Sequence, residues 1–127
     1  MTFRTRFAPS PTGPFHLGHA YSALIAAQEA RARGGEFLLR IEDIDQSRSL
    51  AHWEDQIYDD LACLGLSWPC PVMRQSERAE AYARAVAQLT DAGLTYPCIC
   101  RRADIEAAAG APQEGVPQFG PDGRIYP

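Results

Sequence analysis

The stretch "FAPSPTGPFHLGHAYSAL", residues 7–24, combines a proline-rich loop with the beginning of a helix. The preceding residues 3–7, "FRTRF", alternate apolar or β-branched side chains with arginines, which predicts a strand. Residues 17–33 lack proline and repeat apolar side chains at helical spacing, and Gly34-Gly35 predicts the end of the helix. The sequence therefore predicts a strand–loop–helix unit, with the loop at the carboxyl end of the strand.

Two further helices are predicted downstream. The first can be capped by Ser47 or Ser49 and ends before Gly65. The side chains expected on its core-facing side are Leu50, Trp53, Ile57, Leu61 and Leu64. The second spans residues 77–92 and can be capped by Ser76. The side chains expected to face inward from it are Tyr82, Val86 and Leu89.

Three more segments have the character of strands. The apolar run "EFLLRI" (36–41) predicts a strand buried on both faces, and "VMRQ" (72–75) and "LTYPCIC" (94–100) predict two others. After Glu106 the sequence becomes rich in Gly and Pro and predicts an irregular loop. Alternating strands and helices predict an α/β fold, with a Rossmann-like parallel sheet, flanking helices and right-handed crossovers.

The composition limits the classes of function. The 127 residues carry a net charge of −4 and 46% hydrophobic residues, which fits one domain or part of one. No apolar run could span a membrane, and no signal peptide is evident, so a cytoplasmic location is expected. A nucleic acid would have to meet a local basic patch. The four cysteines are expected to be packing residues or metal ligands rather than disulfides.

The loop after the first strand has the character of a phosphate site. In an open α/β sheet, ligands bind where a strand leads into a helix, and a helix N-terminus attracts phosphate. His16 and His19 both lie in the first turn, and Gly18 would let a flat base approach the backbone. The stretch matches neither the Walker loop nor the GxGxxG pattern. The alternative is a proline-rich turn with two solvated histidines.

Three blocks carry a resemblance to a known family. "HLGH" (16–19) resembles the HIGH motif of class I aminoacyl-tRNA synthetases, and residues 6–20 resemble the glutamate branch throughout. "LRIEDID" (39–45) and "QSERAEAY" (75–82) are similar to the second and third blocks of that branch. The resemblance covers about residues 3–102. It implies the catalytic fold of class I synthetases and a ligase that activates L-glutamate with ATP and Mg²⁺, releases pyrophosphate and passes glutamate to tRNA.

The resemblance also implies the site residues. The residues expected to bind ATP are Pro9, His16, Gly18 and His19, with His16 and His19 as the catalytic contacts to the phosphates. The residues expected to bind glutamate are Arg6, Phe7, Ala8, Pro9, Ser10 and Glu42. The guanidinium group of Arg6 can bind a carboxylate of glutamate in a bidentate manner, and Glu42 can bind its ammonium group. Alternatively, Arg6 and Glu42 form a structural ion pair between neighbouring strands. Asp43 and Asp45 are expected to orient the loop or cap the next helix.

The pair Cys98-Ile99-Cys100 is a candidate for zinc binding. Because a tetrahedral site needs two more ligands, the pair alone is a weak signal, and two buried cysteines are the alternative. In the family branch that glutamylates the queuosine base of tRNA(Asp), zinc is held by C-x-C, a tyrosine and a cysteine. The resemblance therefore implies Tyr126 as the third ligand and a fourth at about position 130. Arg101 and Arg102 could contact tRNA phosphates or form an exposed basic turn.

The sequence leaves two alternatives for the tRNA that accepts glutamate. "PCPVMRQS" (69–76) is closer to the queuosine branch than to glutamyl-tRNA synthetases, whereas His19 is more typical of the wider class. The expected partners are glutamate, ATP and tRNA(Asp) carrying queuosine, and the expected state is a monomer. The first alternative is a glutamyl-tRNA synthetase that charges tRNA(Glu). The second is a non-catalytic paralogue or fragment that binds nucleotide or tRNA.

The resemblance also sets the expected domain limits. Residues 1–93 correspond to the first half of the Rossmann-like catalytic domain, and residues 94–127 to the start of a zinc-binding insertion near the acceptor end of tRNA. The KMSKS-type lysine that stabilises pyrophosphate belongs to the second half of the family fold and is not in this sequence. We therefore expect the 127 residues to be part of a longer enzyme and to be inactive in isolation.

Overall fold

The structure is a computed structural model that describes residues 2–110, 119–120 and 123–124. By its internal contacts the chain divides into two compact units, residues 1–85 and 86–127. The elements of the first unit, with a third helix that runs past its end, are β1 (Arg4–Phe7), α1 (Leu17–Ala32), β2 (Glu36–Ile41), α2 (Ala51–Cys63), β3 (Met73–Arg74), the 3-10 helix η1 (Ser76–Arg78) and α3 (Ala79–Asp91). None of the helices in the described ranges is long and apolar enough to cross a membrane.

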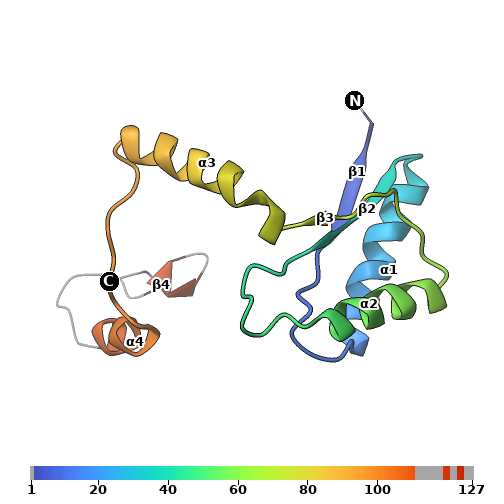
Figure 1. The fold of residues 1–127 in the computed structure, drawn as a ribbon, viewed down its shortest axis with the longest axis horizontal. Helices are drawn as coiled ribbons and strands as arrows, with labels where there is room; N and C mark the ends of the chain where they lie inside the picture. The colour runs from blue at the N-terminus through green and yellow to red at the C-terminus, as the bar shows by residue number, and fades with distance from the viewer. Residues whose placement is uncertain (1, 111–118, 121–122, 125–127) are drawn as a thin grey trace. The chain divides into compact units, whose positions relative to one another are not determined.

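The first unit is built on a parallel sheet with strand order β1-β2-β3 (Figure 1). Helix α1 connects β1 to β2, and α2 connects β2 to β3, which confirms the predicted α/β alternation. Phe7 pairs with Leu39 in the parallel register of β1 and β2. Beyond the strands, the amide of Glu42 donates to the carbonyl of Pro9 over 2.9 Å. The loop after β1 and the end of β2 therefore lie side by side.

One face of the sheet carries the core. Phe37, Leu39 and Ile41 of β2 are buried and alternate with half-buried Glu36, Leu38 and Arg40. The core cluster consists of Phe7, Ala23, Ala30, Phe37, Leu39, Ile41, Ile57 and Leu61. Both helices, α1 and α2, contribute to this cluster and so cover the same face. The prediction that β2 is buried on both faces was therefore wrong for the described structure.

Helix α1 has the predicted limits but packs through its small residues. Its buried side chains are Ala23 and Ala30. The larger apolar residues that revealed its periodicity, Leu17, Tyr21, Leu24 and Ile25, are 41–85% exposed. Alanines let the helix axis approach the sheet closely, and the hydroxyl of Thr5 donates to the Ala26 carbonyl over 2.7 Å. The helix therefore turns its small side chains, and not its large ones, toward β1 and β2.

Helix α2 follows its prediction only in part. Ile57 and Leu61 are buried, but Leu50 and Leu64 are exposed. Leu50 is the N-terminal cap and forms no capping hydrogen bond through its side chain, so the expected caps at Ser47 and Ser49 were wrong. The hydroxyl of Ser47 donates to Asp45 instead. The buried Ser49 hydroxyl has no partner among the described residues.

The start of the third predicted helix also differs. Residues 76–78 form the 3-10 helix η1, and α3 begins only at Ala79. Ser76 does not cap this helix through its side chain, because its hydroxyl donates to Asp43. In the described part of the chain, no residue of α3 is buried, and Val86 and Leu89 are 56% and 46% exposed. Their expected inward orientation was therefore wrong.

The second unit contains the end of α3, helix α4 (Arg102–Gly110) and the short strands β4 (Phe119–Gly120) and β5 (Gly123–Arg124), which pair antiparallel. Residues 94–100 form no strand, so the predicted fourth strand was wrong. The prediction of an irregular loop after Glu106 was also wrong up to Gly110, because this part continues α4. The alanine-rich run 107–109 favours a helix by intrinsic propensity.

Candidate functional site

A cleft of about 470 Å³ opens at the carboxyl end of β1, where the chain passes into α1. Its lining residues are Phe7, Ala8, Pro9, Ser10, Thr12, Gly13, Pro14, His16 and His19. Six of these belong to the site predicted from the sequence, and Thr12, Gly13 and Pro14 were missed although they lie in the same loop. Gly18, Arg6 and Glu42 were predicted for the site but do not line this cleft.

The two histidines of the first turn of α1 lie against each other. The ring centroids of His16 and His19 are 3.7 Å apart with 20° between the planes. The backbone amide of His16 donates to Nδ1 of His19 over 3.4 Å. Burial, followed by the charge of His16, lowers the pKa of His19 below 6.5. With Nδ1 accepting, a neutral His19 carries its proton on Nε2, where it can donate to a ligand in the cleft.

Gly18 lies behind the His16 ring. A Cβ atom at Gly18 would lie 3.1 Å from Cε1 and 3.2 Å from Nδ1 of His16. Such distances are tighter than nine in ten real Cβ contacts, so any larger residue would have to displace the imidazole. Gly18 thus gives His16 the room for its position beside the cleft.

Arg6 lies in β1, directly before Phe7 of the cleft, and Glu42 directly follows β2. Arg6 is exposed and has no ion pair within the residues that the structure describes. Glu42 is half-buried and pairs with Arg40, so the alternative of an ion pair between Arg6 and Glu42 was wrong. The side chains of Arg4, Arg6, Glu36 and Arg40 lie on the face of the sheet opposite the core, as alternation along the strands requires. The side chain of Arg6 is therefore exposed on that face, one residue before Phe7 of the cleft, and is free of an ion pair among the described residues.

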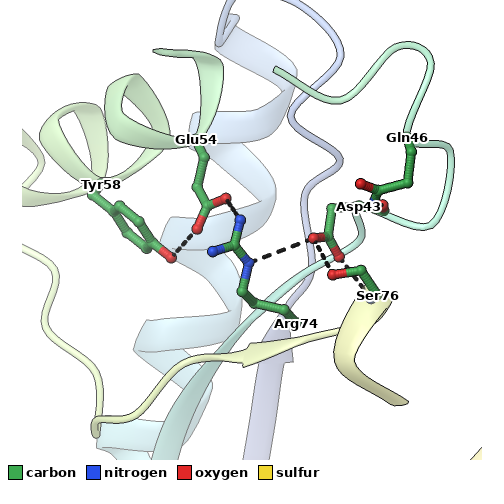
Figure 2. Close-up of polar contacts among 6 residues, drawn as sticks. All are labelled: Asp43, Gln46, Glu54, Tyr58, Arg74 and Ser76. Carbon is green, nitrogen blue, oxygen red and sulfur yellow. Dashed lines mark hydrogen bonds and ion pairs between the residues drawn. The ribbon is translucent and has the colours of Figure 1, made fainter. Parts of the chain in front are cut away.

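The two aspartates after Glu42 bind protein groups. Asp43 is only 4% exposed and accepts the amide and hydroxyl of Ser76 at 2.9 and 2.6 Å (Figure 2). Burial raises the pKa of Asp43, but the Ser76 hydrogen bonds and the charge of Arg74 outweigh burial, and the pKa lies below its ordinary value. Asp45 accepts from Ser47 and Arg48 within its own turn. Both residues orient the loop, as the sequence predicted.

Cys98 and Cys100 are exposed, so the alternative of two buried cysteines was wrong. A hydrogen bond with the Cys98 thiol raises the pKa of the Cys100 thiol, so the two sulfur atoms lie together. Two adjacent thiols fit half of a tetrahedral zinc site. Within the described residues, no group of three or more His, Cys, Asp or Glu could hold a metal ion. Tyr126, the expected third ligand, lies outside the described residues.

Comparison with known proteins gives the family. Residues 2–118 match the model for "tRNA synthetases class I (E and Q), catalytic domain". A glutamyl-Q tRNA(Asp) synthetase from Rhodobacter capsulatus is 59% identical over 97% of this chain and 44% of its own length. A glutamate–tRNA ligase from Pseudomonas putida is 50% identical over 83% of this chain and 23% of its own length. The chain thus spans less than half the length of these curated relatives.

A solved structure shows the same fold. The crystal structure of a glutamate tRNA ligase from Elizabethkingia meningosepticum, in complex with its amino acid, superposes with a TM-score of 0.67. It is 33% identical and covers 86% of this chain and 23% of its own. The strand–loop–helix unit, the parallel sheet and the family match all indicate the same fold. The chain belongs to the class I tRNA synthetases for E and Q and carries sequence of their catalytic domain.

Proposed function

We propose that the full-length protein activates L-glutamate with ATP and transfers it to the queuosine base of tRNA(Asp). The observation that carries this proposal is the cleft at the start of α1, which His16 and His19 line. The carbonyl of Pro9, which also lines the cleft, accepts the amide of Glu42 directly after β2. The N-terminus of a 16-residue helix favours phosphate, and the prolines of the loop hold its shape before the ligand arrives. Family membership supports the same chemistry.

The residues around the cleft can each bind a different part of the two substrates. In the proposed site, Nε2 of His19 and the imidazole of His16 donate to ATP phosphates, and Gly18 leaves room for the adenine. The exposed guanidinium of Arg6 holds a carboxylate of glutamate, with the loop from Phe7 to Ser10 as the floor of the pocket. Glu42 binds the ammonium group. These contacts hold the α-carboxylate in line with the α-phosphorus, and Mg²⁺ bound with ATP offsets the phosphate charge.

The proposed acceptor is supported by the relatives. Glutamyl-Q tRNA(Asp) synthetases from Rhodobacter capsulatus and Geobacter sulfurreducens are 59% and 47% identical over almost the whole chain. The segment "PCPVMRQS" also favours this branch. The alternative acceptor is tRNA(Glu), but the glutamate–tRNA ligase from Pseudomonas putida matches at lower identity, 50% over 83% of this chain, than the relative from Rhodobacter capsulatus.

We further propose that Cys98 and Cys100 supply two ligands of a structural zinc site, with Tyr126 as a third. The contact between the two thiols supports this assignment. Zinc would hold the loop before α4 in place, and Arg101 and Arg102, which are exposed, could then contact tRNA phosphates.

The test compares acceptors. The full-length product of the gene is incubated with ATP, labelled glutamate and one of three RNAs: tRNA(Asp) with queuosine, tRNA(Asp) without it, or tRNA(Glu). We expect label only on tRNA(Asp) with queuosine, and undiminished labelling after removal of the 3′-terminal adenosine, because the bond forms at the base. Labelling of tRNA(Glu) alone would establish the alternative. Absence of glutamate-dependent ATP–pyrophosphate exchange with every RNA would contradict enzymatic function altogether.

A further inference from the structure

Asp43, which directly follows Glu42, is a buried member of a polar cluster that also contains Arg74 and Ser76 (Figure 2). Its Oδ1 accepts the Ser76 amide at 2.9 Å, and its Oδ2 accepts the Ser76 hydroxyl at 2.6 Å. Nε of Arg74 is 3.4 Å from Oδ2. Both carboxylate oxygens therefore accept hydrogen bonds from protein groups.

The cluster extends to α2 through Arg74. Its guanidinium pairs with Glu54, a residue that is only 7% exposed, and Glu54 also accepts the hydroxyl of Tyr58 at 2.8 Å. Arg74 thus lies between two buried carboxylates (Figure 2). Ion pairs between a half-exposed arginine and buried carboxylates contribute little net stability, because desolvation of the carboxylates offsets the attraction between the charges. What the arrangement does provide is a fixed position for the Asp43 carboxylate.

The backbone around Glu42 is held on both sides. The carbonyl of Ile41 accepts the Gln75 amide at 3.0 Å, and the Glu42 amide donates to Pro9 at 2.9 Å. The carbonyl of Asp43 accepts Nε2 of Gln46 at 2.6 Å. Glu42 therefore sits in a peptide segment fixed between the loop of the cleft and the Gln75-Ser76 segment. Among these contacts, the side-chain bonds from Asp43 to Ser76 join residues 33 positions apart.

We infer that Asp43 is a positioning residue for glutamate: bound by Ser76, it fixes the peptide of Glu42 so that the Glu42 carboxylate meets the substrate ammonium. This inference rests on the proposed function, in which Glu42 binds that ammonium. A shift of the Glu42 peptide changes the distance to the ammonium, whereas ATP is held by the loop and the first turn of α1. Loss of the Asp43 contact should therefore weaken glutamate binding and leave ATP binding intact.

The experiment measures KM for each substrate separately. ATP–pyrophosphate exchange is followed for the full-length product, with tRNA present, for wild type, Asp43→Asn, Ser76→Ala and Ser76→Thr. We expect Asp43→Asn to raise KM for glutamate about tenfold and to change KM for ATP less than about twofold. Ser76→Ala should act in the same direction but less, since the backbone contact remains, and Ser76→Thr should restore the wild-type value because it keeps the hydroxyl.

The control is Asp45→Asn, the same substitution two residues on, in a carboxylate that contacts only its own turn among the described residues. Its KM for glutamate should stay at the wild-type value. An equal rise of the KM values for glutamate and ATP in Asp43→Asn would overturn the positioning role. If Asp43→Asn is active, an unchanged KM for glutamate in Ser76→Ala would overturn it as well. If Asp43→Asn does not fold, the comparison of Ser76→Ala with Ser76→Thr decides. Wild-type protein without glutamate-dependent exchange would overturn the proposed function, and the inference with it.

Discussion

The imidazole rings of His16 and His19 are stacked with their centroids 3.7 Å apart, at the entrance of α1 and on the wall of the cleft. Two protonated rings at this distance repel each other, and His19 also loses solvent to Phe15, whose ring centroid is 5.3 Å away. Burial and the charge of His16 therefore lower the pKa of His19 below 6.5. A phosphate in the cleft would act in the opposite direction, because it stabilises the charged imidazole.

The first prediction is a coupling between ATP binding and protonation of His19. NMR titration should give a pKa for His19 below 6.5 in the free protein and a higher one with ATP, so that ATP binds more tightly as pH falls from 8 to 6. His52, which lies in α2 against Trp53, serves as control, and its resonances should not move on ATP addition. A His19 titration that ATP leaves unchanged would contradict the phosphate contact.

Gly18→Ala should affect ATP binding without lowering the stability of the fold. The new methyl group would press on the His16 ring at about 3.1 Å and displace it, so ATP binding measured by calorimetry should weaken about fivefold or more. Thermal stability should not fall, because alanine is favoured over glycine within a helix by about 1 kcal/mol. Gly13→Ala is the matched control, since Gly13 also lines the cleft but has nothing within 4 Å of the added carbon. Equal ATP affinity in both variants would refute the role of Gly18.

Arg6 and Arg4 offer a matched pair on one strand. Both are exposed on the same face of β1, but Arg4 pairs with Glu36 at 2.7 Å, whereas Arg6 has no ion pair among the described residues. Arg6→Ala should raise KM for glutamate more than about tenfold in the full-length product, because a carboxylate loses its charge-assisted hydrogen bonds. Arg4→Ala removes only an exposed pair and should leave KM unchanged. Similar effects of the two substitutions would argue against a glutamate site at Arg6.

The sequence predicted local features well and distant contacts poorly. The β1–loop–α1 unit follows from proline, glycine and apolar spacing, which act within a few residues, and its cleft-lining histidines were found in this way. Helical periodicity also shows that Leu17, Tyr21 and Leu24 share a face of α1, but it cannot show that the smaller alanines face the sheet. The cluster of Asp43, Arg74 and Ser76 joins segments 31 or more residues apart, and no local pattern reveals such pairing.

For Glu42, too, the sequence predicted the position of the residue but not its side-chain partner. Its place after a buried strand predicts that it lies at the carboxyl edge of the sheet, and the hydrogen bond of its amide to Pro9 places it beside the loop after β1. Its actual ion-pair partner, Arg40, is only two residues away, in β2. Alternation along the extended chain places residues 40 and 42 on one face, so this pair could have been predicted, whereas Arg6 is paired with Leu38, four positions before Glu42.

Gly35 is predicted to be required for the pairing of β1 and β2. A Cβ atom at this position would lie 2.3 Å from the carbonyl oxygen of Phe3, which accepts the amide of Glu36 at 2.9 Å. Gly35→Ala should therefore lower the free energy of unfolding by about 2 kcal/mol or more, measured by denaturant titration. Gly13→Ala, with open space around the added carbon, should change it by less than about 1 kcal/mol. Equal stability of the two variants would contradict the close approach of the Phe3 carbonyl to Gly35.

The proposed zinc site predicts a specific loss of metal. The purified full-length product should contain about one zinc per chain by elemental analysis, and Cys98→Ser or Cys100→Ser should remove most of it. The control variants are Cys63→Ser and Cys70→Ser, which alter exposed thiols without ligand spacing and should keep the metal. Because zinc binds thiolates and displaces their protons, its binding should weaken as pH falls. Full zinc content in both Cys98→Ser and Cys100→Ser would rule out these thiols as ligands.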